Sequence, residues 1–438
     1  LNMGTQNGYF TFISQKTRTY KFFIQYFIWE IIQLFAILLF IFAISASLSS
    51  DIFLNDDKIL IYLAAVSVFF TKNIKELIFN TFESKRFTLY YLGFVFAINV
   101  VYLFVVYMLS HYEILSVYYI FAILIVEYFV FLAVSIAIVI KNKKYFVNSF
   151  KRSSLQLTIY RYFLYAKPLF LSIMVGVIYA FSEKWLLQKF GGSVQQAYLA
   201  IASQLTMVIL LFTTSLLKIF WKEVSIMVKK KEFDNLEFYF FSLLRKILFI
   251  SCFVSFFLVV NAETVVVSFY SEKYYASINI FIFMSLYTIH QSLGQIFGTF
   301  LMASEDTKYY SKVSIYTMII QFIGIVFVLL PEKYYGLNTG AIGIAIVMFI
   351  INIISTNIFG YYIIHKYKWK SIILLQIKYI FIVSLFLFMV YYIVSLLTTN
   401  ALMSILYQVS IIILFFVISL FFNNKYNIKN FLLKDYVG

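Results

Sequence analysis

The chain has 438 residues, of which 63% are hydrophobic and 12% are charged, whereas ordinary soluble domains contain roughly 45–50% and about 25% of these classes. It holds 53 Phe and 37 Tyr but only 2 Pro and 1 Cys. A water-soluble protein could not bury so much apolar surface, so the composition excludes a soluble enzyme, a secreted disulfide scaffold and a disordered tail.

Twelve apolar runs have about the 20 residues that a bilayer-spanning helix requires. They are continuous and do not alternate with polar residues, which indicates helices and not the strands of a membrane barrel. The sequence therefore predicts an all-α integral membrane protein with about twelve transmembrane helices. The runs cover residues 22–47, 59–80, 88–110, 114–140, 167–182, 196–220, 238–261, 275–302, 309–330, 338–361, 372–398 and 402–423.

The formal net charge of +16 is distributed unevenly over the predicted loops. When the loops are assigned alternately to two sides, 26 Lys and Arg fall on the side of the N-terminus and 5 on the other side. Such a bias marks the cytoplasmic side. We therefore expect a multi-pass protein of the cell inner (cytoplasmic) membrane, with both termini of this chain cytoplasmic. Short basic loops suit anionic lipid headgroups, so we expect no nucleic-acid partner.

The longest basic connection, from Lys141 to Lys167, divides the chain into two lobes. We interpret two similar segments as a repeat, because Phe79–Phe82 ends the second span and Phe297–Phe300 ends the eighth. If they are equivalent, the first lobe lacks an N-terminal helical hairpin. Two parallel bundles are a common transporter plan. We expect four helices in an N-terminal lobe at 1–150, six in a C-terminal lobe at 151–365, and two additional helices with a cytoplasmic tail at 366–438.

The most specific pattern lies between residues 165 and 223. It comprises Tyr165-Ala166-Lys167-Pro168-Leu169, Glu183-Lys184-Trp185-Leu186, the pair Gly191-Gly192 with a following Gln195, and Phe220-Trp221-Lys222-Glu223. This stretch resembles the seventh and eighth helices of the polysaccharide (O-antigen, capsule or exopolysaccharide repeat-unit) flippases in the multidrug/oligosaccharidyl-lipid/polysaccharide exporter superfamily. Lys218 departs from the family pattern, which has an uncharged residue there. Residues 1–14 resemble the loop after the family's second helix, in agreement with a missing hairpin.

The resemblance implies a MATE-like fold of two pseudo-symmetric helical lobes and a flippase function. The implied substrate is a polyprenyl-diphosphate-linked oligosaccharide repeat unit, moved by alternating access for cell-surface polysaccharide biosynthesis. The implied partners are this lipid-linked oligosaccharide, membrane lipids, and polymerase and chain-length proteins of the same pathway. Two alternatives stay open. A multidrug or cation exporter of the same superfamily would need a cavity rich in carboxylates, and a membrane polysaccharide polymerase would need a long outer loop.

Charged residues lie inside several of the predicted spans, where a charge costs about 2.5–3.5 kcal/mol or more and usually marks function. Lys72 and Lys75 are candidates for the substrate cavity, because ammonium groups attract a diphosphate as point charges and still allow its release. Glu30 and Glu127 are candidates for coupling transport to H⁺ or Na⁺.

Each of these assignments has a structural alternative. In this alternative, Lys72 and Glu76, which are spaced i,i+4, neutralise each other. Lys75, Lys218 and Lys378 would extend their ammonium groups to the cytoplasmic headgroups.

Other polar residues allow the same two interpretations. His290 and Gln291, in the eighth span, either line the cavity or hydrogen-bond across helices, for about 0.6 kcal/mol each. Glu183 and Lys184, at the outer end of the fifth span, form either an outer gate or an ordinary surface pair. The sequence contains no hydrolytic, metal-binding or phosphate-loop motif, so we expect no enzyme activity, metal or cofactor.

Overall fold

The computed structural model describes residues 5–14, 20–47, 58–84, 87–114, 116–141, 155–369, 372–398 and 403–411. Every regular element in these ranges is a helix. Eight helices are long and apolar enough to cross a membrane, and two shorter apolar helices cover Ile59–Phe69 and Val117–Ala133. The predicted all-α membrane architecture is therefore confirmed.

The helices form two compact units, each built from separate stretches of the chain. Unit 1 comprises Leu1–Val177, Leu216–Leu236 and Gly298–Ile315, and unit 2 comprises Ile178–Ser215, Glu237–Phe297 and Tyr316–Gly438. The predicted lobes at 1–150 and 151–365 stay a prediction, because unit 1 groups helix ends that come from both of them.

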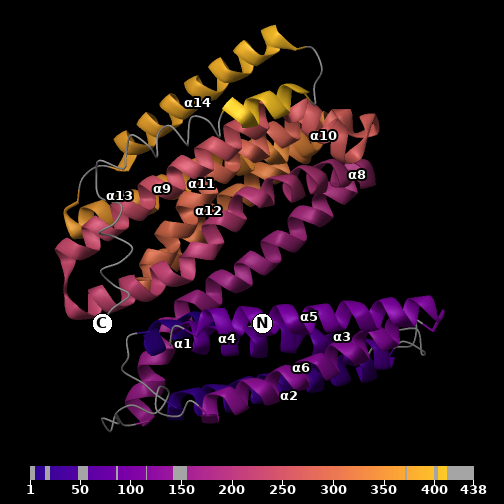
Figure 1. Ribbon diagram of the computed structural model, residues 1–438, viewed down its shortest axis with the longest axis vertical. Coiled ribbons are helices and arrows are strands. Elements are labelled where there is room, and N and C mark those ends of the chain that lie inside the picture. The colour runs from indigo at the N-terminus through magenta and orange to yellow at the C-terminus, as the bar shows by residue number, and fades with distance from the viewer. Residues whose placement is uncertain are drawn as a thin grey trace. The chain divides into compact units, whose positions relative to one another are not determined.

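Unit 1 contains the first seven helical elements and an aromatic core. Figure 1 shows α2, α3, α5 and α6 side by side, as their contacts require. Phe70 on η2 stacks on Tyr128 of α6, and Tyr91 of α5 packs edge-on against Phe131. The elements are α1 (Thr5–Ser14), α2 (Tyr20–Ser47), α3 (Lys58–Phe69), η2 (Phe70–Ile74), α4 (Lys75–Ser84), α5 (Thr88–His111) and α6 (Val117–Lys141).

The second predicted span is interrupted by η2, a π-helix. The backbone N–H of Lys75 bonds to the carbonyl of Phe70, five residues earlier instead of four. A π-turn inserts one residue into an α-helix and changes which side chains share a face. The i,i+4 spacing assumed for Lys72 and Glu76 therefore does not apply across η2.

Helix α8 (Leu155–Lys230) contains the fifth and sixth predicted spans in one element of 76 residues. The only non-helical backbone inside it is at Gly192, with φ 76° and ψ 178°. This combination of angles is essentially restricted to glycine. The fifth span thus extends to Gly191, and Glu183 and Lys184 lie within the helix and not at its end. Residues of α8 belong to both units.

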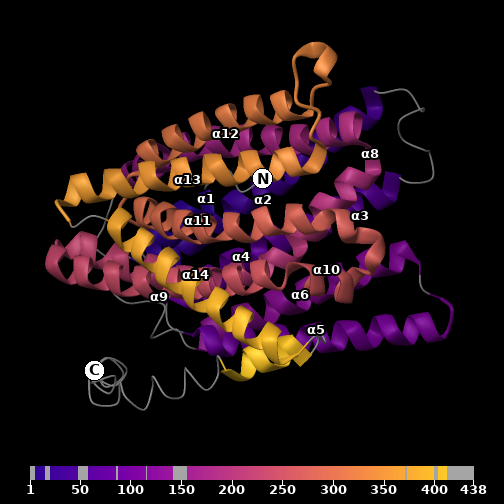
Figure 2. The ribbon, with the colours of Figure 1, turned by 90° about the horizontal axis from the view of Figure 1, so that it is seen from above.

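Unit 2 contains α9 and most of the later helices. Figures 1 and 2 both show α11, α12 and α13 side by side. At Gly324 of α12 a Cβ atom would lie 2.9 Å from Val347 of α13, so glycine permits this close approach. The elements are α9 (Phe233–Val260), α10 (Ala262–Tyr270), η3 (Glu272–Ser277), α11 (Ile278–Ala303), α12 (Thr307–Leu329), η4 (Glu332–Tyr334), α13 (Gly340–Tyr367) and α14 (Ile372–Leu397), followed by a helix at 403–411.

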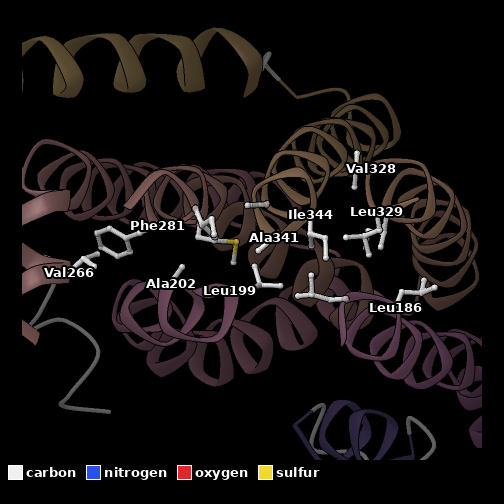
Figure 3. Packing of buried hydrophobic residues seen from close by; sticks show 14 of the residues in the cluster. Leu186, Leu199, Ala202, Val266, Phe281, Val328, Leu329, Ala341 and Ile344 are labelled. Carbon is white, nitrogen blue, oxygen red and sulfur yellow. The ribbon is translucent and has the colours of Figure 1, made fainter. Parts of the chain in front are cut away.

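A buried apolar cluster holds five helices of unit 2 together (Figure 3). Phe281 and Val266 are both fully buried, and they join α11 to α10. The cluster also includes Leu186, Leu199, Ala202, Val328, Leu329, Ala341 and Ile344.

Side-chain amides attach two further segments of unit 2. The Gln195 Oε1 atom accepts a hydrogen bond of 3.0 Å from the backbone N–H of Ala341 and so caps the start of α13. Asn261 and Gln408 exchange two hydrogen bonds, of 2.8 and 3.2 Å, and both side chains are buried. The helix at 403–411 is therefore held against the junction of α9 and α10.

The remaining spans agree with the sequence prediction to within a few residues at most ends. Only residues 403–411 of the predicted span 402–423 are described. The basic connection at 142–154, the pair Lys85–Arg86 and the basic residues of the tail lie outside the described residues. Residues 5–14 differ from the prediction: they form the buried helix α1 and not a loop.

We expect Gly192→Ala to destabilise the protein by about 1–3 kcal/mol, because alanine disfavours this backbone conformation even though no atom lies within 4 Å of the added Cβ. The measurement is equilibrium unfolding in mixed micelles. Gly93→Ala is the matched control, since Gly93 lies in α5 with equally open space around it and alanine favours a helix. Equal stability of both variants would contradict the assignment of strain to Gly192.

Candidate functional site

The most deeply buried carboxylate in unit 1 belongs to Glu30 on α2, whose side chain is 0% exposed. Asn73 of η2 donates from Nδ2 to Glu30 Oε2 at 2.8 Å and approaches Gln33 Oε1 at 3.5 Å. Gln6 of α1 donates from Nε2 to the backbone carbonyl of Asn73 at 3.0 Å. We call Gln6, Glu30, Gln33 and Asn73 the Glu30 cluster.

Two polar atoms of the Glu30 cluster are unsatisfied. Glu30 Oε1 and Gln33 Nε2 are buried and have no hydrogen-bond partner among the residues that the structure describes. A charged carboxylate at low dielectric is costly unless its oxygens are paired. Binding a proton or a cation at Oε1 would remove that cost, so the cluster is suited to reversible ion binding. The described residues contain no group of three or more His, Cys, Asp and Glu side chains that could hold a metal ion.

A second polar cluster surrounds Lys218 near the end of α8. Its Nζ atom lies 2.9 Å from Asn80 Oδ1 and 3.4 Å from Glu76 Oε1. It also lies 5.1 Å from the centre of the Phe10 ring and 5.9 Å from that of Trp221, within the range of cation–π attraction. We call Glu76, Asn80 and Lys218 the Lys218 cluster.

The Lys218 cluster corrects one structural expectation. Lys218 does not extend to the headgroups, because Glu76 and Asn80 hold its ammonium group inside unit 1. The Lys72 side chain lies outside the described residues, so its pairing with Glu76 stays a prediction. By contrast, Lys378 on α14 is exposed, as expected for a lysine that faces outward.

Helix α1 supplies the centre of a third group of contacts. Thr11 Oγ1 accepts a 2.8 Å hydrogen bond from Trp221 Nε1 and lies 3.1 Å from the hydroxyl of Tyr165. The Tyr165 hydroxyl also donates to the carbonyl of Met302, at 3.0 Å. Asn7 Nδ2 lies 3.5 Å from the Met302 sulfur. We call these five residues the α1 cluster.

The opposite face of α1 contacts α4. The hydroxyl groups of Tyr9 and Thr81 are 2.8 Å apart, and the Tyr9 ring stacks on Tyr26. Burial raises the pKa of the Tyr9 hydroxyl, and the bond to Thr81 lowers it by less. Tyr9 therefore stays neutral and acts only as a hydrogen-bonding group.

The structure places the other candidates of unit 1 near one another. Lys75 is half-buried, with Nζ 6.0 Å from the ring centres of both Tyr128 and Phe131. It forms no ion pair within the described part of the chain, yet it is close enough to Glu127 for electrostatic interaction. Lys72 lies in η2, and its side chain is outside the described residues.

His290 and Gln291 lie in unit 2, on α11. His290 is 8% exposed, and its Nδ1 atom has no hydrogen-bond partner among the described residues. The Gln291 Oε1 atom accepts from the hydroxyl of Tyr287 at 3.1 Å. Thr356 of α13 donates to the backbone carbonyl of His290 at 3.1 Å. Because the four substrate-cavity candidates divide between two units, the shared cavity stays a prediction.

Glu183 and Lys184 have different surroundings. Lys184 is exposed, whereas Glu183 is half-buried and close enough to Tyr179 and Tyr287 for electrostatic interaction. Within the described residues the two form no ion pair with each other. This arrangement differs from a simple surface pair, and the outer gate stays a prediction.

Sequence reasoning alone does not identify Gln6, Gln33 and Asn73. An amide inside an apolar span is itself a signal for Gln33 and Asn73, because polar groups in lipid are costly. Gln6 carries no such signal, since it precedes the first predicted span. Its partner lies 67 residues away.

Comparison with known proteins supports the fold. No protein-family model matches the sequence, and no curated protein matches it. Solved transporters do share the fold. A MATE transporter in a straight conformation has a TM-score of 0.65 and 14% identity, over 84% of both chains. A variant of the Vibrio cholerae MATE transporter VcmN has a TM-score of 0.67 and 12% identity, over 83% of this chain and 84% of that chain.

A third similar structure is a MOP superfamily transporter from Pyrococcus furiosus, described as having a binding pocket of reverse polarity. It has a TM-score of 0.63 and 15% identity, over 84% of both chains. At these identities the likeness concerns the fold. The chain therefore has the MATE-like helical fold that the sequence predicts.

We expect Lys218→Met and Glu76→Gln to be coupled by about 0.5–1.5 kcal/mol in a double-mutant cycle, because each removes the same partly buried ion pair. Unfolding in mixed micelles measures the four stabilities. The Lys230–Glu232 pair, at 3.5 Å but largely exposed, is the matched control, for which we expect coupling close to zero. Additive effects at Lys218 and Glu76 would contradict the assigned pair.

Proposed function

We propose that the protein is a flippase for polyprenyl-diphosphate-linked oligosaccharide repeat units. It moves them from the cytoplasmic to the outer leaflet of the cytoplasmic membrane by alternating access, for cell-surface polysaccharide biosynthesis. Two findings support transport in general: the apolar helical architecture and the fold shared with MATE transporters. The resemblance of residues 165–223 to polysaccharide flippases supports the choice of substrate.

The observation that best supports an anionic substrate is the position of Lys75. Its ammonium group is half-buried at the start of α4, beside two aromatic rings, and forms no ion pair with any residue that the structure describes. Burying an ammonium group in a membrane costs free energy, and a charged residue that is retained there usually serves a function. A diphosphate cannot cross hydrocarbon unaided, and a lysine can attract it as a point charge without rigid geometry. Lys72 lies three residues before Lys75 in the sequence and brings a second positive charge to the same segment.

The Glu30 cluster supplies the coupling site of this proposal. Its unpaired Oε1 atom can exchange between a charged state and a state that holds a proton or Na⁺. Each state stabilises different neighbours, which is the requirement for an ion to shift a conformational equilibrium. Glu127, near Lys75, is the second carboxylate that can take this role.

The proposed orientation follows from the distribution of basic residues, which places both termini of this chain in the cytoplasm. The lipid-linked oligosaccharide is then taken up at the side where its sugar is assembled. Polymerase and chain-length proteins of the same pathway would use the product at the outer leaflet. A multidrug or cation exporter has the same fold, but it would favour carboxylates over Lys72 and Lys75 in its cavity.

We expect deletion of the gene to cause accumulation of lipid-linked repeat units on the inner leaflet, because the flippase step follows their synthesis. The measurement is chromatography of extracted lipids from deleted and complemented strains, with periodate or lectin access reporting the leaflet. An exporter or a polymerase predicts a different result. Loss of an exporter causes no accumulation, and loss of a polymerase causes accumulation on the outer leaflet.

We expect Glu30→Gln, Lys72→Ala and Glu127→Gln each to lower flipping by about tenfold or more, equivalent to about 1.4 kcal/mol, at an unchanged amount of protein in the membrane. Each removes a charge that is retained inside the membrane at a cost. Glu263→Gln is the control, because Glu263 is an exposed carboxylate in the first turn of α10. Full complementation by all three variants would contradict both the cationic cavity and the coupling site.

A further inference from the structure

Helix α1 joins the Glu30 cluster to the α1 cluster. At one position Gln6 bonds to the carbonyl of Asn73, whose side chain holds Glu30. The next residue, Asn7, and Thr11 one turn beyond it contact residues that come from far later in the chain. The helix is buried along the whole length for which burial is described, apart from the half-buried Asn7.

The α1 cluster gathers helix ends from both predicted lobes. Tyr165 and Trp221 lie near the two ends of α8, and Met302 lies at the end of α11. The count of basic residues assigns all three of these ends to the cytoplasmic side. Next to them the buried Lys222 donates to the backbone carbonyl of Glu83 at 3.4 Å. In the proposed topology these contacts close the cytoplasmic side of the protein.

The described residues that face Glu30 come from three elements. From α2 it is faced by Tyr26 and Gln33, from η2 by Asn73, and from α1 by Gln6. Tyr26 hydrogen-bonds to Glu30 through its hydroxyl, and the other three side chains are amides. A change of charge within the described part of this cluster is therefore a change at Glu30.

We propose that α1 links the charge of Glu30 to closure of the cytoplasmic side, an inference that rests on the proposed flippase topology. With Glu30 charged, Asn73 makes a charge-assisted hydrogen bond that holds η2 in its π-helical form. The backbone of η2 then presents the Asn73 carbonyl to Gln6 and keeps α1 in place. Thr11 and Asn7 thereby remain bonded to α8 and α11.

Neutralising Glu30, by a proton or a bound cation, weakens its bond to Asn73. The π-turn can then return to an α-helix, which turns the preceding segment by about 100°, the rotation per residue of an α-helix. That rotation withdraws the Asn73 carbonyl from Gln6 and releases α1 from the helix ends. The two forms of η2 are thus the two-state element on which this coupling depends.

Chemical cross-linking between α1 and α11 tests the inference. We place Asn7→Cys and Met302→Cys, whose native side chains touch at 3.5 Å, in a full-length chain that carries Cys252→Ala to remove the single native cysteine. A short bis-methanethiosulfonate reagent is applied to membranes, and the yield of cross-linked protein is measured. We expect Glu30→Gln to lower this yield by about fivefold or more, and Glu263→Gln, at an exposed carboxylate of α10, to leave it unchanged.

Two variants of α1 distinguish the contact between Gln6 and Asn73 from the contacts that α1 makes with α8 and α11. Gln6→Met keeps side-chain length but cannot donate to Asn73, so the yield should be the same with Glu or Gln at position 30. Thr11→Val removes the bonds to Trp221 and Tyr165, so it should lower the yield while the response to Glu30→Gln persists. Size-exclusion chromatography confirms folding, and Glu30→Ala replaces Glu30→Gln if the latter does not fold.

An unchanged yield in folded Glu30→Gln, or a full response of Gln6→Met to Glu30→Gln, would overturn the inference. Lipid accumulation is measured separately in the deleted strain. If the cross-linking responds as expected but no lipid-linked repeat unit accumulates, the inference stands and the proposed substrate is wrong. If repeat units accumulate but cross-linking does not respond, the coupling through α1 is wrong and the flippase function stands.

Discussion

Lipid offers no hydrogen-bond partner, so each polar group that this chain carries into the membrane must find its partner within the protein. This constraint explains the three clusters of unit 1. Lys218 is paired by Glu76 and Asn80, and Asn73 holds one oxygen of Glu30. Glu30 Oε1 and the Lys75 ammonium have no hydrogen-bond or ion-pair partner in the part of the chain that the structure describes, so no such contact there offsets the cost of burying them. Those two positions are where a function is best sought.

The membrane architecture could be predicted from the sequence because it depends on a local property. A run of about 20 apolar residues specifies a spanning helix wherever it occurs. The ends of α5 and α14 accordingly agree with their predicted runs to within one residue. Intramembrane charges such as Glu30 and Lys75 are equally visible, because they interrupt such runs. The MATE-like fold followed from the resemblance of one 60-residue stretch together with the number of spans.

The arrangement of the candidate site could not be predicted, because its contacts join residues distant in sequence. Lys218 and Glu76 are 142 residues apart, and no local pattern selects Glu76 over Lys72 as a partner. The π-helix η2 has no recognised sequence signature, yet it decides where Asn73 lies. Helix α1 is only 10 residues long and polar in part, so its burial depends on helices that the local sequence does not specify.

The burial of α1 also constrains the order in which the protein can assemble during synthesis. Asn7 leaves the ribosome 295 residues before its partner Met302. At about 5–20 residues per second, that interval lasts roughly 15–60 s. Throughout it, the side-chain amide of Asn7 must stay hydrated near the membrane surface. The last step of unit 1 assembly is then the closing of α11 over an element that was made before it.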